Sequence, residues 1–503
     1  MSDVKPTKGV QPPTSGTPIS RRRFLTTGGL LALSSLTAPM LAACGGASST
    51  TSPTAPASGA AGGDAWKQFS GTTINFISEN TAPTSAIAAD PKPFTDLTGI
   101  KVQITQLELG ALVEKVALDF SSGQGSYHVI YADPYQVLAP YYKALADLNQ
   151  FMNDQSLPQV PKGVDDFIPT QLAAAGRFAD EKMLYALPYD CPTMIWMYRK
   201  DLFEKYGKQM QQDLGFDPTP SEASTWDQYY QIAKWFNDHA KDDVKYGTGH
   251  QAKQYDSLMC DFSNILWAYG GDYFQNGLDV GKLGTDKPGP CQLDQPKAIE
   301  AATFYQKLLA IAHPGSTTWD WSGVDEAFRA GEIAMVPNWH EFAAGIEGSK
   351  LAGKVGYERL PKGPARAADM YGGTGLAINK GAPEKEQKAA WLFLVWATSP
   401  ETQIAGLKSK VGGGTPTRQS VYDMPEVKQA MQPPSSMPNI LTATAVAKAW
   451  KPENIGLRPK IPQWNQCDTI IFTEVSKMLA GQKTPEQAMR DAKQGFDQTT
   501  GAA

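Results

Sequence analysis

The 503-residue chain carries 46 Lys and Arg against 51 Asp and Glu, which gives a formal net charge of −5 at pH 7. This length is enough for two or three domains. Basic residues cluster only in the N-terminal leader, so the sequence argues against a nucleic-acid-binding surface.

The N-terminal stretch at residues 20–44, SRRRFLTTGGLLALSSLTAPMLAAC, has the order of an export signal. A basic cluster precedes an apolar core diluted by Gly, Ser, Thr and Pro, which favours a cleaved signal over an uncleaved membrane anchor. Its Ser-Arg-Arg-x-Phe-Leu sequence resembles the twin-arginine export motif, and Leu-Ala-Ala-Cys resembles a bacterial lipobox. We therefore predict a signal peptide over residues 1–43 and a diacylated Cys44 as the first mature residue.

The segment at residues 44–64 is rich in Gly, Ser, Thr, Ala and Pro, so it is predicted to be a flexible tether. Cleavage would remove five basic residues and one acidic residue, which leaves 41 basic and 50 acidic residues and a net charge of −9. No later uncharged run in the sequence reaches membrane length. The mature chain is therefore expected to be held at the membrane by its lipid.

The mature part begins with alternating strand and helix patterns. Strands are predicted at residues 72–77, 101–106 and 128–132, where β-branched residues and alternation agree. One predicted helix follows a turn region and ends near Gly99, and another covers residues 109–121. This order predicts a parallel α/β sheet.

The alternation of predicted strands and helices resumes after Pro188. A strand is predicted at residues 194–198, and the following DLFEKYG sequence predicts a helix that Gly207 ends. A capping box at Thr225 predicts a helix that continues to His239.

The C-terminal half carries further helix starts and strands. Ser399 and Thr484 each precede a proline and are predicted helix N-caps. Strands are predicted at residues 333–336 and 375–379, before a helical tail. Two α/β units of this kind predict two lobes with a ligand cleft between them.

Four cysteines remain besides Cys44: Cys191, Cys260, Cys291 and Cys467. In an oxidising compartment they could form two disulfides by three connectivities, and the alternative is four buried free thiols. A protein that folds before export folds in a reducing compartment, so the fold should form without disulfides.

Motifs for enzymatic chemistry are missing from the sequence. It contains no zinc-ligand spacing, no phosphate-binding loop, no dinucleotide-binding loop and no Gly-x-Ser-x-Gly. A catalytic carboxylate pair stays open, because a sequence does not show the distance between two acids.

Aromatic and carboxylate residues gather instead at the ends of predicted strands, in SENTAP, YADPYQ, LPYDCP, WAYGGDYF, TWDWSG, PNWHEF and IPQWNQCD. Aromatic rings pack on the C–H faces of sugars, and carboxylates and amides bind their hydroxyl groups. Core packing is the alternative for any single aromatic residue. The whole set favours a cleft for polyhydroxy ligands.

From about residue 72 to 498 the chain resembles the extracellular solute-binding proteins of carbohydrate ABC importers, the group that contains maltodextrin-binding proteins. The resemblance is carried by LPYDCPTMIWMYRKDLFEKYG, STWDQYYQIAKWF, AFRAGEIAMVPNWHEF, GGTGLAINKGAPEKEQKAAWLFLVWATSPETQ and RPKIPQWNQ, in this order. It implies an α/β fold of type II, with two lobes joined by a multi-stranded hinge. The implied lobes are residues 65–188 plus 335–396, and residues 189–334 plus 397–498.

The same resemblance implies a binding protein without enzymatic activity or cofactor. Ligand would close the lobes, and the closed monomer would dock on a permease pair driven by a separate ATPase. The ligand-binding residues carried over from the family are Glu79, Asn80, Asp133, Tyr135, Tyr189, Asp190, Trp267, Tyr269, Gly270, Trp319, Trp321, Asn338, Trp339, Gly373, Arg418, Trp464 and Asp468. The family often has an aromatic residue where Asp468 stands.

These loops are mainly acidic and aromatic, with Arg418 as their main base, so a neutral sugar or polyol is expected rather than a phosphorylated ligand. Two alternatives remain at this point. One is a surface glycoside hydrolase that uses two carboxylates. The other is a binding protein that serves a membrane sensor instead of a permease.

Overall fold

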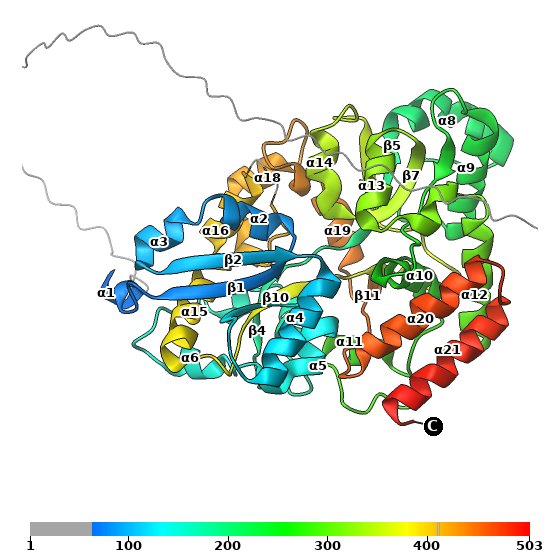
Figure 1. The fold of residues 1–503 in the computed structure, drawn as a ribbon. Helices are drawn as coiled ribbons and strands as arrows, with labels where there is room; N and C mark the ends of the chain where they lie inside the picture. Colours follow the sequence, from blue (N-terminus) through cyan, green and yellow to red (C-terminus); the bar gives the residue numbers. More distant parts are fainter. Residues whose placement is uncertain (1–62, 410, 412, 503) are drawn as a thin grey trace, which may run out of the picture. The chain divides into compact units, whose positions relative to one another are not determined.

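The computed structural model describes residues 63–409, 411 and 413–502. The predicted signal peptide, Cys44 and most of the tether lie outside the described residues. The described chain builds two α/β lobes, each around its own sheet and hydrophobic core (Figure 1).

The first lobe contains a five-stranded sheet in the order β2-β1-β3-β10-β4. Its strands are β1 (Thr73–Glu79), β2 (Lys101–Leu107), β3 (Val129–Ala132), β4 (Ala186–Asp190) and β10 (Thr374–Ile378). The three strands predicted near the start of the mature chain are confirmed. Strand β1 pairs in parallel with β2 and β3, as predicted.

Strand β10 departs from the parallel prediction. It is inserted between β3 and β4 and runs antiparallel to both, and Figure 1 shows this yellow strand among the blue and cyan strands. The chain reaches β10 only after it has passed through the second lobe. All five of its residues are buried, because it occupies the interior of the sheet.

Helices pack on this sheet: α2 (Ala82–Ala89), α3 (Lys92–Thr98), α4 (Leu109–Ser122) and α15 (Glu384–Ala397). Gly99 ends α3 with a φ of 72°, the left-handed conformation that glycine adopts without a Cβ clash. The stretch predicted to be a turn region holds α2, whose Pro83 fits a first helical turn. Phe393 of α15 packs against Phe76 and Phe94 and joins helix to sheet.

The second lobe contains a four-stranded sheet in the order β6-β7-β5-β8. Its strands are β5 (Met194–Arg199), β6 (Tyr246–Thr248), β7 (Ile333–Trp339) and β8 (Val355–Glu358). Strand β5 pairs antiparallel with β7 and β8, whereas β6 and β7 are parallel. The predicted strands at 194–198 and 333–336 are confirmed.

The main helices of the second lobe are α8 (Lys200–Leu214), α9 (Trp226–His239), α10 (Asp256–Ala268), α12 (Pro296–Leu309), α13 (Trp321–Arg329), α20 (Trp464–Leu479) and α21 (Pro485–Thr500). The C-terminal pair α20 and α21, red in Figure 1, packs on α10 and α12. The predicted capping box at Thr225 is present, and the predicted N-cap Thr484 also forms a capping box with Gln487. The prediction that Gly207 ends a helix was wrong, because α8 continues to a left-handed Gly215.

Two short strands, β9 (Asp369–Met370) and β11 (Ile455–Gly456), pair in parallel near the passage between the lobes. The remaining elements are α1 (Gly63–Lys67), η1 (Pro134–Leu138), α5 (Ala139–Tyr141), η2 (Tyr142–Ala144), α6 (Asn149–Asn153), η3 (Val164–Asp166), α7 (Pro169–Gln171), η4 (Leu172–Gly176), α11 (Gly277–Lys282), η5 (Pro314–Thr318), η6 (His340–Phe342), α14 (Ala343–Glu347), α16 (Pro400–Leu407), α17 (Gln419–Tyr422), α18 (Pro425–Ala430), η7 (Pro438–Thr442) and α19 (Ala443–Ala449). No helix in the described part of the chain is both long and apolar enough to cross a membrane.

Strand pairing assigns some residues to a different lobe from the one that the family resemblance implies. Residues 335–358 include most of β7 and all of β8, which pair with β5 in the second lobe, not with the first sheet. Helix α16 packs on α2 in the first lobe. Long-range strand pairing and helix packing decide these memberships, and local sequence patterns do not report them.

Candidate ligand-binding cleft

A cavity of about 400 Å³ lies between the two lobes. The first lobe lines it with residues at the ends of β1 and β3, and the second lobe lines it with α13 and the segment after β7. Strands β1 and β3 are parallel neighbours, so the residues that follow them meet at one edge of the sheet. The arrangement is an interlobe cleft.

Five residues predicted from the sequence line this cavity: Glu79, Asn80, Asp133, Trp321 and Trp339. Glu79 ends β1 and Asp133 follows β3, so the first lobe contributes carboxylates and an amide. The two tryptophans come from the second lobe. The cavity therefore combines polar groups with aromatic rings.

Tyr135 and Asp468 lie directly behind the lining. The guanidinium carbon of Arg458 stands 4.2 Å from the centroid of the Tyr135 ring. Gln136 donates from Nε2 to Asp256 Oδ1 (2.8 Å) and to Asp468 Oδ2 (3.1 Å). These side chains contact the lining residues Asp256 and Arg458 and help to fix their positions.

Tyr189 lines a second cavity of about 410 Å³, between α2 and α16 within the first lobe. Apolar side chains make most of its wall, including Ile87 and Trp396. Because it lacks the concentration of polar groups that surrounds the interlobe cavity, the interlobe cavity is the candidate site.

Four predicted residues lie in or beside the core of the second lobe, outside the cleft lining. The rings of Trp267 and Trp464 both pack against Tyr273, with centroids 6.4 Å and 5.4 Å away. Tyr269 packs on Phe304 with centroids 5.1 Å apart, and Gly270 follows it with a φ of 85°.

Three further predicted residues lie outside the lining but close to lining residues in the sequence. Trp319 stacks on His313 with ring centroids 4.5 Å apart. Asn338 accepts a hydrogen bond from the backbone N–H of Trp339 (2.8 Å) and donates to the carbonyl of Trp321 (3.1 Å), so it helps to orient both cleft tryptophans. Gly373 lies between Gly372 and Thr374, which both line the cavity.

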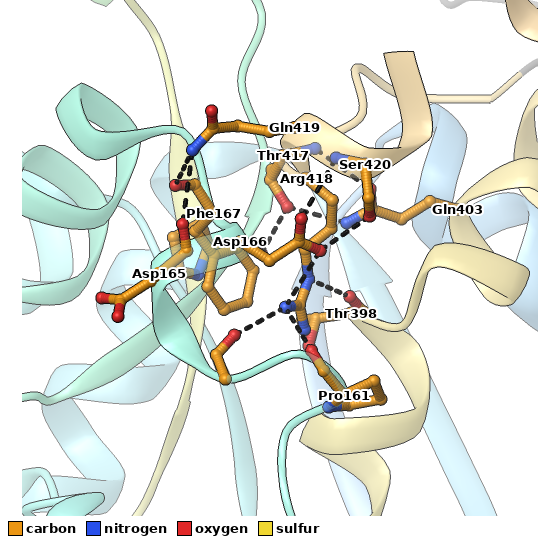
Figure 2. A network of polar contacts seen from close by, with 12 residues as sticks. Pro161, Asp165, Asp166, Phe167, Thr398, Gln403, Thr417, Arg418, Gln419 and Ser420 are labelled. Carbon is orange, nitrogen blue, oxygen red and sulfur yellow. Dashed lines mark hydrogen bonds and ion pairs between the residues drawn. The ribbon is translucent and has the colours of Figure 1, made fainter. Parts of the chain in front are cut away.

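Arg418 lies outside the cavity, completely buried against the first lobe (Figure 2). It donates to the carbonyl oxygens of Thr398 (2.9 Å), Pro161 (3.1 Å) and Gly163 (3.2 Å). Asp166 stands 3.7 Å from Nη1 and also accepts hydrogen bonds from the N–H and hydroxyl of Ser420. Carbonyl oxygens and one carboxylate thus pair with Nε and Nη1 of this guanidinium.

Sequence reasoning missed several lining residues, among them Tyr131, Asp256, Asp325, Arg329, Glu341 and Arg458. A signal existed for most of them. Glu341 belongs to PNWHEF and Arg458 to RPKIPQWNQ, two stretches that already carried the family resemblance. Asp256 had no such signal, because it is the first residue of a helix that reaches the cleft only through tertiary packing.

The lining carries more acids than bases. Arg458 lies 3.1 Å from Asp133 and 3.7 Å from Asp256, and Arg329 lies 2.6 Å from Asp325. Burial, and then the charges of Asp133 and Asp256, raise the pKa of Glu79 to about 8. At neutral pH Glu79 is therefore mainly protonated and can donate a hydrogen bond.

Glu341 forms a carboxyl pair with Asp190, the predicted residue that ends β4. Asp190 Oδ1 accepts from the backbone N–H groups of Cys191 (3.0 Å) and Thr415 (2.6 Å). Burial raises the pKa of both acids, and the neighbouring Asp190 raises that of Glu341 further. Both buried carboxyl groups therefore favour the protonated form more than exposed carboxyl groups do.

The four cysteines of the described chain, Cys191, Cys260, Cys291 and Cys467, are buried free thiols. Burial raises the pKa of each thiol, to about 12 for Cys291. Of the two alternatives left open by the sequence, the structure has the one without disulfides. Residues 63–409, 411 and 413–502 contain no cluster of His, Cys, Asp and Glu suited to a metal ion.

Two α/β lobes with a polar and aromatic cleft between them define a solute-binding protein of the type II fold. The chain belongs to the bacterial extracellular solute-binding protein family, whose model matches residues 56–404. Proteins of this family and fold are the substrate-binding components of ABC transporters, not enzymes.

Two relatives are similar over most of the chain. One, from Sinorhizobium fredii, is named a probable amino-acid ABC transporter periplasmic-binding protein; it is 24% identical over 84% of this chain and 88% of its own. The erythritol/L-threitol-binding protein of Mycolicibacterium smegmatis is 25% identical over 80% of this chain and 82% of its own.

Among solved structures, an ABC transporter solute-binding protein from Agrobacterium radiobacter K84 in complex with ribitol is 25% identical. It has a TM-score of 0.67 and covers 84% of this chain and 98% of its own. The predicted fold and the class of binding protein are confirmed, and the glycoside hydrolase alternative is not supported.

Proposed function

We propose that this chain captures a neutral sugar or polyol in its interlobe cleft and delivers it to an ABC permease pair driven by a separate ATPase. The observation that carries the proposal is the composition of the cleft: carboxyl groups of both lobes and the rings of Trp321 and Trp339 line one cavity of about 400 Å³. The names of two similar proteins, one that binds erythritol or L-threitol and one solved with ribitol, support this ligand class.

The charge of the cleft supports a neutral ligand over an amino acid, the ligand class in the name of the Sinorhizobium relative. An amino acid carries a carboxylate, which needs a free guanidinium or ammonium group. Both arginines of the lining, Arg329 and Arg458, are already paired with aspartates. An incoming carboxylate would also meet Glu79 and Glu341.

The hydrogen-bonding groups suit hydroxyls, which both donate and accept. Asp133 and Asp256 accept hydrogen bonds, whereas a protonated Glu79 can donate one. Trp321 and Trp339 supply apolar faces for the C–H groups of a sugar or polyol. A cavity of this size favours a monosaccharide or a short polyol over a long oligosaccharide.

The N-terminal sequence supports export and lipid anchoring. We infer that the twin-arginine motif exports a folded protein and that Cys44, after cleavage, carries the lipid that holds a monomeric binding protein at the outer side of the membrane. Mass spectrometry of the membrane fraction should find acylated Cys44 as the first residue. An intact Arg21-Arg22 leader on the mature protein would contradict this inference.

The ligand class is tested by thermal shift and tryptophan fluorescence with C4 to C6 polyols, monosaccharides and amino acids. A sugar or polyol at 100 times its dissociation constant should stabilise the fold by about 2.7 kcal/mol and raise the melting temperature. If folded protein responds to amino acids and to no sugar or polyol, the proposal is wrong. Paired permease genes beside the coding gene would support import, and a lone receptor kinase gene would support sensing.

A further inference from the structure

The floor of the cleft, defined here as Asp133, Asp256 and Arg458, joins the two lobes by charge. Asp133 follows β3 of the first lobe, and Asp256 begins α10 of the second. Arg458 Nη2 lies 3.1 Å from Asp133 Oδ2, and Nη1 lies 3.7 Å from Asp256 Oδ1. All three side chains line the cavity although none is more than 4% exposed as a residue. One guanidinium therefore lies between a carboxylate of the first lobe and a carboxylate of the second.

Neighbouring groups hold the floor in a fixed geometry. Asp133 Oδ1 accepts from the backbone N–H groups of Tyr135 (2.8 Å) and Gln136 (2.7 Å), so Oδ2 is left to face Arg458. Gln136 also donates to Asp256 (2.8 Å). The face of Tyr135 lies against the guanidinium, an arrangement that adds a cation–π attraction. Arg458 is thus held by Asp133, Asp256 and the ring of Tyr135.

Three polar atoms in or near the floor lack hydrogen-bond partners. Within the described chain, Nε of Arg458, the hydroxyl of Thr374 and Oδ1 of Asp468 are buried without a partner. Thr374 and Arg458 are cavity residues. Buried polar atoms without partners are costly, so a ligand hydroxyl or an ordered water at the floor would relieve them.

We propose that Arg458 is a positioning and specificity-determining residue: by pairing with both Asp133 and Asp256, it links the two lobes at the floor and makes the cleft prefer uncharged polyols over polyols that carry an amine. The inference rests on the proposed function. In the wild-type protein the guanidinium already occupies the cationic position between the two carboxylates. A ligand ammonium at the same place would meet a like charge in a region of low dielectric.

Arg329, the other arginine of the lining, has no such bridging role. Its partner Asp325 stands one turn earlier on α13, with Nε 2.6 Å from Oδ2. Breaking that pair would leave a single carboxylate within one lobe. Loss of Arg458 would instead leave carboxylates of two lobes facing each other, and a protonated amine on the ligand could replace the missing charge.

The test compares a polyol with its amine-bearing counterpart, sorbitol and glucamine (1-amino-1-deoxysorbitol), by calorimetry at pH 7 in wild type and in Arg458→Gln. We expect Arg458→Gln to weaken sorbitol binding by about ten- to a hundredfold, the cost of losing a charged hydrogen-bonding partner. The ratio of glucamine affinity to sorbitol affinity should rise by about tenfold or more. Arg458→Lys keeps the charge and should keep the wild-type ratio.

Arg199→Gln is a matched control, because Arg199 also pairs with an aspartate (Asp201, 2.6 Å) but lies outside the cleft lining. It should lower stability without changing either affinity. If Arg458→Gln does not fold, the double variant Asp256→Asn with Arg458→Gln removes one charge of each sign and should restore folding. In that variant glucamine should gain less than in Arg458→Gln, because one carboxylate is gone.

Two negative results are distinguishable. If the wild type binds no sugar or polyol in the full panel, the proposed function fails. The second negative result requires that the wild type binds sorbitol or another panel polyol. If folded Arg458→Gln, or the double variant, then keeps the wild-type ratio of affinities for that polyol and its 1-amino-1-deoxy form, only the role of Arg458 is overturned.

Discussion

The guanidinium carbon of Arg418 lies 3.7 Å from the centroid of the Phe167 ring, and this contact joins the segment after α16 to the core of the first lobe (Figure 2). Three backbone carbonyls accept hydrogen bonds from Nε and Nη1, and Asp166 lies 3.7 Å from Nη1. The arrangement predicts a structural role for a residue that the family resemblance suggested as a ligand contact.

Replacement of Arg418 by methionine should lower the free energy of unfolding by about 3 kcal/mol or more, because the three carbonyls would lose their donor and Asp166 would lose its cation. Urea unfolding measures the loss. The exposed pair Arg490–Glu486 supplies a control, and Arg490→Met should show no measurable loss. If folded Arg418→Met instead lost ligand affinity at unchanged stability, Arg418 would be a ligand contact after all.

The two tryptophans of TWDWSG should behave differently. Trp321 lines the cleft, whereas Trp319 stacks on His313 outside the lining. Trp321→Ala should weaken sugar or polyol binding by about tenfold or more, through loss of an aromatic face against the ligand. Trp319→Ala should lower the melting temperature and leave the dissociation constant within about twofold of wild type. Calorimetry on both variants checks this, and the reverse pattern would contradict the cleft described here.

Glu79 should make stability depend on pH. Its pKa is about 8 in the folded protein against an ordinary value of 4.5, because of burial and the charges of Asp133 and Asp256. Between these values the folded protein holds a proton that the unfolded chain has released, so this contribution to stability is lost as pH rises from about 4.5 to about 8. Glu79→Gln keeps a neutral side chain throughout.

The stability of Glu79→Gln relative to wild type should therefore increase with pH across this window and level off above it. Urea unfolding of the ligand-free proteins at pH 5, 6, 7, 8 and 9 measures the difference. Parallel stability curves for the two proteins would show that Glu79 titrates normally.

Lys460 should be a strong link between the lobes. Its ammonium is completely buried and donates to the carbonyls of Ala173, Ala174 and Arg177 beside the first sheet, and to that of Lys282 at the end of α11. The four donor–acceptor distances are 2.7–3.0 Å. Methionine at this position would leave these carbonyls without a donor, at a cost of about 2–4 kcal/mol.

Chemical unfolding of Lys460→Met tests this expectation. Lys234, which forms an exposed ion pair with Asp238 on α9, is the matched control, and Lys234→Met should be nearly neutral. Equal effects of the two substitutions would mean that the buried carbonyls find other partners, and Lys460 would then not be a structural link.

Much of the first lobe could be predicted because its signals are local. The strands β1, β2 and β3 show alternation or buried β-branched runs within a few residues, and Gly99 marks the end of α3 through a hydrogen bond to a near neighbour. The errors occur where packing overrides such signals. Helix α8 passes through Gly207, because it continues to bury apolar side chains such as Met210 beyond the glycine.

The residues of the candidate site also fall into two groups, those that local patterns could predict and those that only packing places. Glu79, Asn80 and Asp133 follow neighbouring parallel strands, so their meeting could be expected from the sequence. Trp267 and Trp464 stand in similar aromatic stretches, yet they belong to the core of the second lobe. An aromatic residue near a strand end suits a core and a cleft equally well, and only the packed structure distinguishes the two.

The sequence by itself predicted the export signal that we propose and the alternating α/β elements, since these depend on residues close together in the chain. The family resemblance and the order of the first strands further predicted the class of binding protein and the polar edge of the first sheet. Tertiary structure alone decided that β10 enters the first sheet in antiparallel orientation and that Arg458 meets Asp133, 325 positions away. The physical reason is that strand insertion and buried ion pairing depend on which distant segments can exclude water together, and no local pattern carries that information.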